Sequence, residues 1–181
     1  MSLITPAIIT PAIGTPMEGG FLGARYIDEN GALAGLVVSR AEVGDFDPVP
    51  WLKKLRDVPG ACSLLDGLAN TRAMAEAGSE IAQTILDLEI DGVGGWHIPA
   101  LDQMTGLRAT AMPRAGITPA QSLAEVFQEG SPEAFRQEWY WTSTQYSSGY
   151  AWLQDFFNGD QSHDSGKGIS YRVRAVRKCL L

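Results

Sequence analysis

The stretch Trp-Tyr-Trp-Thr-Ser-Thr, residues 139–144, decides the fold class, because aromatic and β-branched residues follow one another there without a break. Such residues favour a β-strand. A second strand is predicted over residues 151–157, and the turn signal Asn-Gly-Asp at residues 158–160 ends it. Residues 169–176 predict a closing strand after a polar loop, because apolar and basic side chains alternate there. The end of the chain therefore predicts an antiparallel set of strands.

The middle of the chain predicts helices. Residues 70–86 read as one long helix, because apolar side chains recur at three- and four-residue steps. A short helix is expected over residues 100–107, and a third over residues 118–128, where Pro119 suits a first turn. The apolar stripe of the first helix consists of Met74, Ala77, Ile81, Ile85 and Leu88.

Upstream of the helices, the sequence predicts a β-hairpin. Residues 21–27 and 32–39 read as strands, and Asn30-Gly31 between them favours a tight turn. A polar loop with Asp45, Asp47 and two prolines follows and ends at Trp51. A hairpin, then helices, then antiparallel strands make an α+β layout.

Residues 1–19 form a proline-rich arm in front of a domain that we place at residues 20–181. The unit Ile-Thr-Pro-Ala-Ile occurs at residues 4–8 and again at 9–13. A proline every five residues blocks helix and central strand alike, so the arm should be extended, near polyproline II. Two interpretations stay open: a disordered tail, or an apolar arm that docks on its own domain or on a neighbouring subunit and so makes a homo-oligomer.

Charge and hydropathy exclude some partners. The net charge is −7, which argues against nucleic acid as a partner, because phosphate binding needs clustered cations. Basic residues do gather near the C-terminus, where we favour a salt-bridged strand face over an anion site. The chain has no run of 18 apolar residues, so no membrane insertion is expected. The basic residues are Arg172, Arg174, Arg177 and Lys178.

The two cysteines, Cys62 and Cys179, favour two free thiols over one bridge. Neither lies in a Cys-x-x-Cys motif or beside a histidine, so metal binding and nucleophilic chemistry lack support. The N-terminus lacks the basic start of a secretory signal. The predicted location is therefore a virion or cell surface reached without that signal, and otherwise the cytoplasm.

Several motifs stand in order along residues 60–177, two thirds of the chain. They are Asp-Gly-Leu-Ala-Asn-Thr (66–71), Gly-Gly-Trp-His-Ile-Pro (94–99), Tyr-Trp-Thr-Ser-Thr (140–144), Tyr-Ala-Trp (150–152), Phe-Asn-Gly (157–159) and Tyr-Arg-Val-Arg-Ala-Val-Arg (171–177). Together they resemble the signature of DUF1566 domains. The resemblance implies a C-type-lectin-like fold, in which two helices flank a small antiparallel sheet and long loops hold the binding face. Proteins of this kind include phage tail-fibre receptor binders and the variable proteins of diversity-generating retroelements.

Departures from the family pattern shape the expected function. His97 and Gln103 stand where the family often has Arg and Glu, and the calcium-binding tripeptides of animal C-type lectins are absent. We therefore expect no cofactor, and the resemblance gives no support for calcium-dependent sugar binding. Two alternatives stay open: an enzyme like the formylglycine-generating oxidases, which share the wider fold but rely on a cysteine pair, or a structural tail or assembly protein. The sequence has no Ser-His-Asp, paired-carboxylate or phosphate-loop pattern, so we expect no enzyme activity and no catalytic residue.

The stretch between Thr144 and Gly168 is rich in Tyr, Ser, Gly, Asn and Trp, the residue types that recognition loops use. Aromatic side chains supply contact area at low entropy cost, and Ser and Asn supply adaptable hydrogen bonds. We expect this stretch to contact a bacterial surface protein or glycan. The predicted contact face consists of Tyr146, Ser147, Ser148, Tyr150, Trp152, Gln154, Asn158, Asp160, Gln161, His163 and Asp164.

Some aromatic residues are expected inside. Strict alternation places Trp152, Gln154 and Phe156 on one face of their strand and Phe157 on the other, so one phenylalanine of the pair should be core. Trp96 and Trp141 are expected in the core, and Trp152 fits either the core or the surface.

Titratable residues get plain interpretations. His97, beside Trp96, is read as a structural histidine rather than a base. Asp160, His163 and Asp164 are too few and too close together in one loop to predict a metal site.

Overall fold

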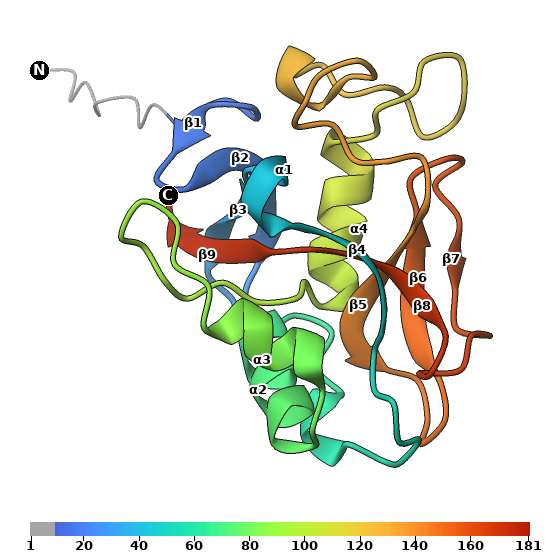
Figure 1. The fold of residues 1–181 in the computed structure, drawn as a ribbon. Helices are drawn as coiled ribbons and strands as arrows, with labels where there is room; N and C mark the ends of the chain where they lie inside the picture. Colours follow the sequence, from blue (N-terminus) through green and yellow to red (C-terminus); the bar gives the residue numbers. More distant parts are fainter. Residues whose placement is uncertain (1–9) are drawn as a thin grey trace, which may run out of the picture.

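The structure is a computed structural model that describes residues 10–181, in which helices and two β-sheets form an α+β fold (Figure 1). Residues 1–9, with the first of the two Ile-Thr-Pro-Ala-Ile units, lie outside the described residues. The predicted arm does not stay separate along its whole length, because β1 (Pro16–Met17) pairs with β2 (Gly20–Ile27). None of the helices within residues 10–181 has the length and apolar character needed to cross a membrane.

The first sheet contains strands from near both ends of the described residues. Its strand order is β1-β2-β3-β9, all antiparallel, with β3 at Leu33–Ser39 and β9 at Val176–Leu180. The β2–β3 pairing confirms the predicted hairpin. Gly20 is required where the two strands meet, because a Cβ there would lie 1.9 Å from the Val38 carbonyl oxygen. The single closing strand predicted over residues 169–176 is wrong in one respect, since the chain forms two strands and the second belongs to this sheet.

The second sheet has the strand order β4-β8-β5-β6-β7. Its β5 and β8 are parallel where Tyr140 pairs with Arg172, so the sheet is mixed and the expected purely antiparallel set is wrong. Residues 161–162 form a short strand inside the predicted polar loop. The strands are β4 (Asp45–Pro50), β5 (Trp139–Gln145), β6 (Ala151–Asp155), β7 (Gln161–Ser162) and β8 (Ser170–Arg174).

Strand β4 replaces the predicted polar loop. It pairs with β8 through Asp45 and Phe46 and again through Val49, with an irregularity in between. Pro48 falls in that irregularity, and β4 is an edge strand, where a missing N–H donor is tolerated. The paired residues of β8 lie 120 to 129 positions further along the chain, which is why the local pattern read as a loop.

The predicted long helix is two helices, α2 (Gly67–Glu76) and α3 (Glu80–Leu86). Gly78 between them has φ 92°, a left-handed conformation that ends a helix. Ser79 then caps α3, since its Oγ accepts a hydrogen bond from the Ala82 amide, and the same hydroxyl donates to the Trp51 carbonyl. The buried stripe itself is confirmed by Met74, Ile81 and Ile85, with Ala77 and Leu88 half-buried.

The remaining helical segments within residues 10–181 are α4 (Leu101–Thr110), which is as long as α2, and three short pieces. The predicted second helix is confirmed as α4, which packs against β2 of the first sheet and β5 and β6 of the second. The predicted third helix is wrong: residues 118–128 contain only the short 3-10 helix η2 (Glu125–Phe127). Buried Ser122 holds that segment to the end of α4, because its hydroxyl donates to the Thr110 carbonyl. The remaining short elements are α1 (Ala41–Gly44) and η1 (Pro59–Ala61).

Tryptophans fill the core beside the second sheet. Trp96 and Trp141 are fully buried, as predicted, together with Trp51. Each indole N–H donates to a backbone carbonyl: Trp141 to Val49 at 3.0 Å, Trp51 to Thr142 at 2.9 Å, and Trp96 within its own loop. The Trp51 and Trp141 indoles therefore fix β4 against β5 as well as filling space.

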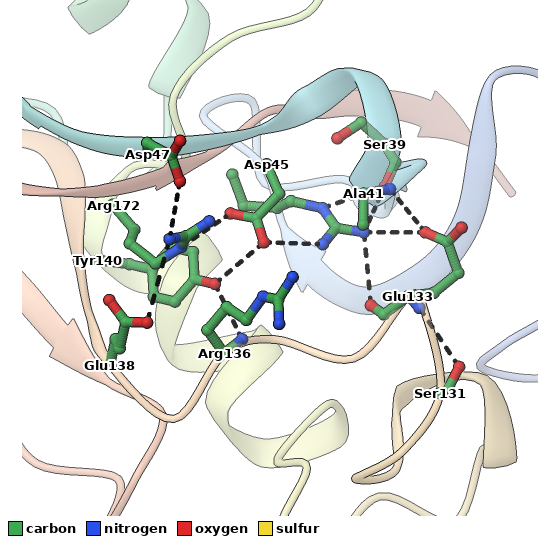
Figure 2. Close-up of polar contacts among 11 residues, drawn as sticks. Ser39, Ala41, Asp45, Asp47, Ser131, Glu133, Arg136, Glu138, Tyr140 and Arg172 are labelled. Atoms are coloured by element: carbon green, nitrogen blue, oxygen red, sulfur yellow. Dashed lines mark hydrogen bonds and ion pairs between the residues drawn. The ribbon is translucent and has the colours of Figure 1, made fainter.

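A buried ionic network clamps β8 in place (Figure 2). Arg172 Nε lies 3.3 Å from an oxygen of Asp45, and Arg174 Nη2 lies 3.1 Å from an oxygen of Glu133. The Arg174 guanidinium also donates to the Ser39 carbonyl at 2.7 Å, which reaches the first sheet. Lys178 makes similar pairs with acidic residues of the β2–β3 turn. Three of the four basic residues, Arg172, Arg174 and Lys178, are therefore salt-bridged within the fold, whereas the Arg177 guanidinium donates to the Glu18 backbone carbonyl.

Candidate ligand-binding surface

The hairpin formed by β5 and β6 ends in a loop that carries two exposed tyrosines. The amides of Tyr146 and Ser147 both donate to the Tyr150 carbonyl, at 2.9 and 3.1 Å, which closes the loop tightly. The Tyr146 and Tyr150 side chains are 53% and 46% exposed. Ser147 is half-buried and Ser148 is exposed. The hairpin thus presents aromatic rings to solvent on a closed backbone turn.

Three rings from three segments form an aromatic cluster, which consists of Tyr146, Trp152 and His163. The Tyr146 and His163 rings are stacked, with centroids 3.9 Å apart and an interplanar angle of 16°. Trp152 meets both rings edge-on, at centroid distances of 5.7 Å to Tyr146 and 4.8 Å to His163. Trp152 is half-buried, between the two options left open from sequence. The predicted face does bring these residues together.

Polar partners orient the histidine of the cluster. His163 Nδ1 lies 3.2 Å from an oxygen of Asp164, and the Asp164 amide donates to the Ser162 hydroxyl. Gln161, at the start of β7, donates to the Thr105 hydroxyl on α4 at 2.9 Å. The far end of the face is therefore tied to a helix of the scaffold.

The turn after β6 supplies further polar groups. Asn158 accepts from the Asp160 amide at 3.0 Å and donates to the Asp160 carboxylate at 2.7 Å. Asp155, which the sequence did not single out, accepts from the Phe157 amide at 2.8 Å and shapes the turn. Asn158 and Asp160 are exposed, but much of their hydrogen-bonding capacity is used within the turn.

Gln154 was expected on the contact face, but the structure buries it completely. Its amide nitrogen donates to the carbonyls of Asp155 and Asp160, so the side chain lies under the turn at residues 155–160. Strict alternation failed because that turn folds back over the strand. Phe156 is buried and Phe157 is 47% exposed, which confirms that one of the pair is core.

Some residues that complete the surface were missed. The Arg114 guanidinium lies over the exposed Phe157 ring, 4.4 Å from its centroid. Residues 146–150, the tyrosine loop, join β5 to β6. Lys167 and Gln145 are buried beneath this loop and form a hydrogen bond of 2.8 Å with each other. Their only signal in the sequence is a charged residue between two glycines, Gly166-Lys167-Gly168.

Candidate chemistry elsewhere is limited. His97 is fully enclosed, with Nδ1 3.2 Å from the Gly95 carbonyl oxygen, and burial lowers its pKa to about 4, which suits a structural histidine. Cys62 and Cys179 are free thiols, as favoured from sequence. Within residues 10–181, no three His, Cys, Asp or Glu side chains gather in a way that could hold a metal ion.

The chain matches no protein-family model and no curated protein sequence.

Proposed function

We propose that this protein is a receptor-recognition protein that binds a bacterial surface protein or glycan through the exposed end of its β5–β6 hairpin. We propose further that the scaffold is a C-type-lectin-like domain of the DUF1566 kind, of phage or retroelement origin. The observation that carries the proposal is the aromatic cluster of Tyr146, Trp152 and His163, which is partly open to solvent and is carried by the β5–β6 loop, by β6 and by the residue after β7.

The physics of recognition supports this assignment. Aromatic rings exposed on a closed turn bury much area on binding and lose little conformational entropy, because only two side-chain torsions must be fixed. Exposed Ser148 lies in the same loop as Tyr146, and exposed Asp164 lies beside His163, so hydrogen-bonding groups accompany the rings, whereas Asn158 and Asp160 lie in the turn at the other end of β6. Scattered exposed apolar residues are ordinary on a soluble protein, but a cluster of stacked rings with a polar rim is typical of a binding site.

The oxidase alternative gains nothing from the fold. Such an enzyme relies on a cysteine pair, whereas Cys62 follows η1 and Cys179 lies in β9 opposite Gly35, and both are free thiols. The assembly-protein alternative is compatible with ligand binding, because the N-terminal arm and the hairpin loop are different parts of the chain.

A cell-binding assay tests the proposal. Fluorescently labelled protein is applied to a panel of intact bacterial strains, to purified lipopolysaccharide and to a glycan array. We expect wild-type binding to at least one target, and a loss of at least tenfold in affinity for the double variant Tyr146→Ala/Tyr150→Ala. Because both tyrosines are about half exposed, the melting temperature of that variant should fall by only a few degrees.

The matched control is Ile27→Ala, which removes a side chain that is 53% exposed at the end of β2 in the first sheet and should leave binding unchanged. Wild-type protein that binds nothing in the three target sets, or a double variant that binds as well as wild type, contradicts the proposal. The retroelement origin has its own test: a near-copy of the coding region for residues 140–175, differing at template adenines, beside a reverse transcriptase gene.

A further inference from the structure

Lys167 is a fully buried lysine directly under the tyrosine loop. Lysine is almost never fully buried unless it is paired, because its ammonium group is strongly hydrated in water. Here it lies between β7 and β8, in the Gly166-Lys167-Gly168 segment, with its Nζ 4.6 Å from the centroid of the Trp51 ring. Its position needs an explanation that packing alone does not give.

The Lys167 ammonium group is fully hydrogen-bonded. Its Nζ donates to Gln145 Oε1 at 2.8 Å, to the Arg56 carbonyl at 3.0 Å and to the Ser148 carbonyl at 3.2 Å. An ammonium group has three N–H donors, so these acceptors use all of them. The three acceptors come from β5, from the segment after β4 and from the tyrosine loop, and Lys167 therefore joins these three parts.

The backbone of the same residue binds the loop as well. The Lys167 amide donates to the Gly149 carbonyl at 2.9 Å, and the Leu52 amide donates to the Lys167 carbonyl at 3.0 Å. Next to it, Tyr150 and Gly166 form an isolated β-bridge. The loop that carries Tyr150 is thus attached to one short segment through both side-chain and main-chain bonds.

Gln145 extends this attachment into the body of the protein. Its Oε1 also accepts from the Val58 amide at 3.0 Å, and its Nε2 donates to Asp57 Oδ1 at 2.8 Å and to the Cys62 thiol at 3.3 Å. The Gln145 amide therefore bridges the Asp57 carboxylate and the Lys167 ammonium group by hydrogen bonds.

Burying the Lys167 ammonium group costs free energy, so a contribution to the overall stability of the fold does not explain why a lysine is present. The acceptors around the ammonium group are neutral oxygens, and removing a charge from water without an opposite charge in contact costs free energy. Burial accordingly lowers the pKa of Lys167 to about 8, although Asp57 and Cys62 act in the opposite direction. An apolar side chain would fill the space at a lower cost, so the lysine is better explained by what its three donors hold.

We propose that Lys167 is a positioning residue of the ligand-binding surface: its three hydrogen bonds fix residues 146–150 so that Tyr146 and Tyr150 are held in their binding geometry before the ligand arrives. Preorganisation of this kind raises affinity by lowering the entropy lost on binding. The inference rests on the proposed function for what the loop binds, and on the contacts above for how the loop is held.

Amide hydrogen exchange on the ligand-free protein tests the inference with the variant Lys167→Met. Methionine keeps an unbranched side chain of similar length and removes the three N–H donors. We expect at least tenfold faster exchange for the amides of residues 146, 147 and 167, which bond within the loop or to it. Amides of β3 should change by less than twofold. The matched control is Lys53→Met, which removes an exposed lysine paired with Glu80 and should leave exchange in the loop unchanged.

The melting temperature separates positioning from a general structural role. We expect Lys167→Met to melt within a few degrees of wild type, because the loop can open and the freed carbonyls can meet water. Faster exchange across both sheets with a large fall in melting temperature, or unchanged exchange at the three loop amides, overturns the inference. No ligand is used, so this result is independent of the cell-binding assay, and a failure of one proposal is distinguishable from a failure of the other.

Discussion

The neighbouring residues Phe156 and Phe157 should respond to the same substitution in opposite ways. Phe156 is fully buried, stacked on Phe135 with centroids 4.0 Å apart, and meets Tyr140 edge-on at 5.4 Å. Replacing a buried phenylalanine by alanine costs about 3–5 kcal/mol, through lost burial and the cavity left behind. Phe157 is half exposed, and its main partner is the Arg114 guanidinium, a contact that contributes about 0.5–1 kcal/mol at such a site.

The expected loss of unfolding free energy is therefore about 4 kcal/mol for Phe156→Ala and about 1 kcal/mol or less for Phe157→Ala. For a chain of 181 residues, each kcal/mol moves the melting temperature by roughly 2–4 °C. Phe156→Ala should then melt about 8–16 °C below wild type, and Phe157→Ala within about 4 °C of it.

Urea unfolding followed by tryptophan fluorescence measures both values, provided that the dependence of free energy on urea is the same for the three proteins. The comparison controls itself, because the two variants differ by one position in the same turn. Equal losses for the two variants would refute the assignment of Phe156 to the core and with it the account of how the turn folds over β6.

Two further predictions concern the histidine and the arm. Burial lowers the pKa of His97 from 6.5 to about 4, so the unfolded chain binds more protons than the folded chain between these pH values. The free energy of unfolding should therefore fall by up to about 3 kcal/mol as the pH drops from 6.5 to 4. Urea unfolding at a series of pH values measures this loss, and a loss in His97→Gln as large as in wild type would contradict the prediction. A cleft of about 650 Å³ is lined by Ala12, Ile13 and Leu123, and we propose that the apolar arm of a second copy enters it. Deleting residues 1–9 should accordingly reduce a homo-oligomer to a monomer in light scattering, and an unchanged mass would favour the tail interpretation.

Local patterns gave the elements whose neighbours in sequence are also their neighbours in space. The β2–β3 hairpin, the β5–β6 hairpin and the stripe of Met74 and Ile81 all follow from residue order alone. The break between α2 and α3 was also readable in principle, because Gly78-Ser79 is a helix stop followed by a cap.

Long-range pairing explains the errors. Strand β4 pairs with β8, and the sequence of Asp45–Pro50 contains no signal that predicts this pairing. In the candidate site, the aromatic members followed from composition, but Gln154 was misplaced because the covering turn lies outside its strand. Lys167 escaped notice because a lysine in a glycine-rich loop ordinarily reaches into solvent, and only the carbonyls brought there by other segments bury it.

The pairing of β9 with β3 has a consequence for synthesis. A growing chain emerges from the ribosome with its N-terminal end first, so the hairpin of β2 and β3 is available long before its last strand. Until Val176–Leu180 arrives, β3 has an open edge of unpaired amides and carbonyls flanked by apolar side chains. Loss of the final few residues should therefore promote aggregation of nascent chains, so a tag or fusion at the C-terminus needs a spacer that lets β9 close the sheet.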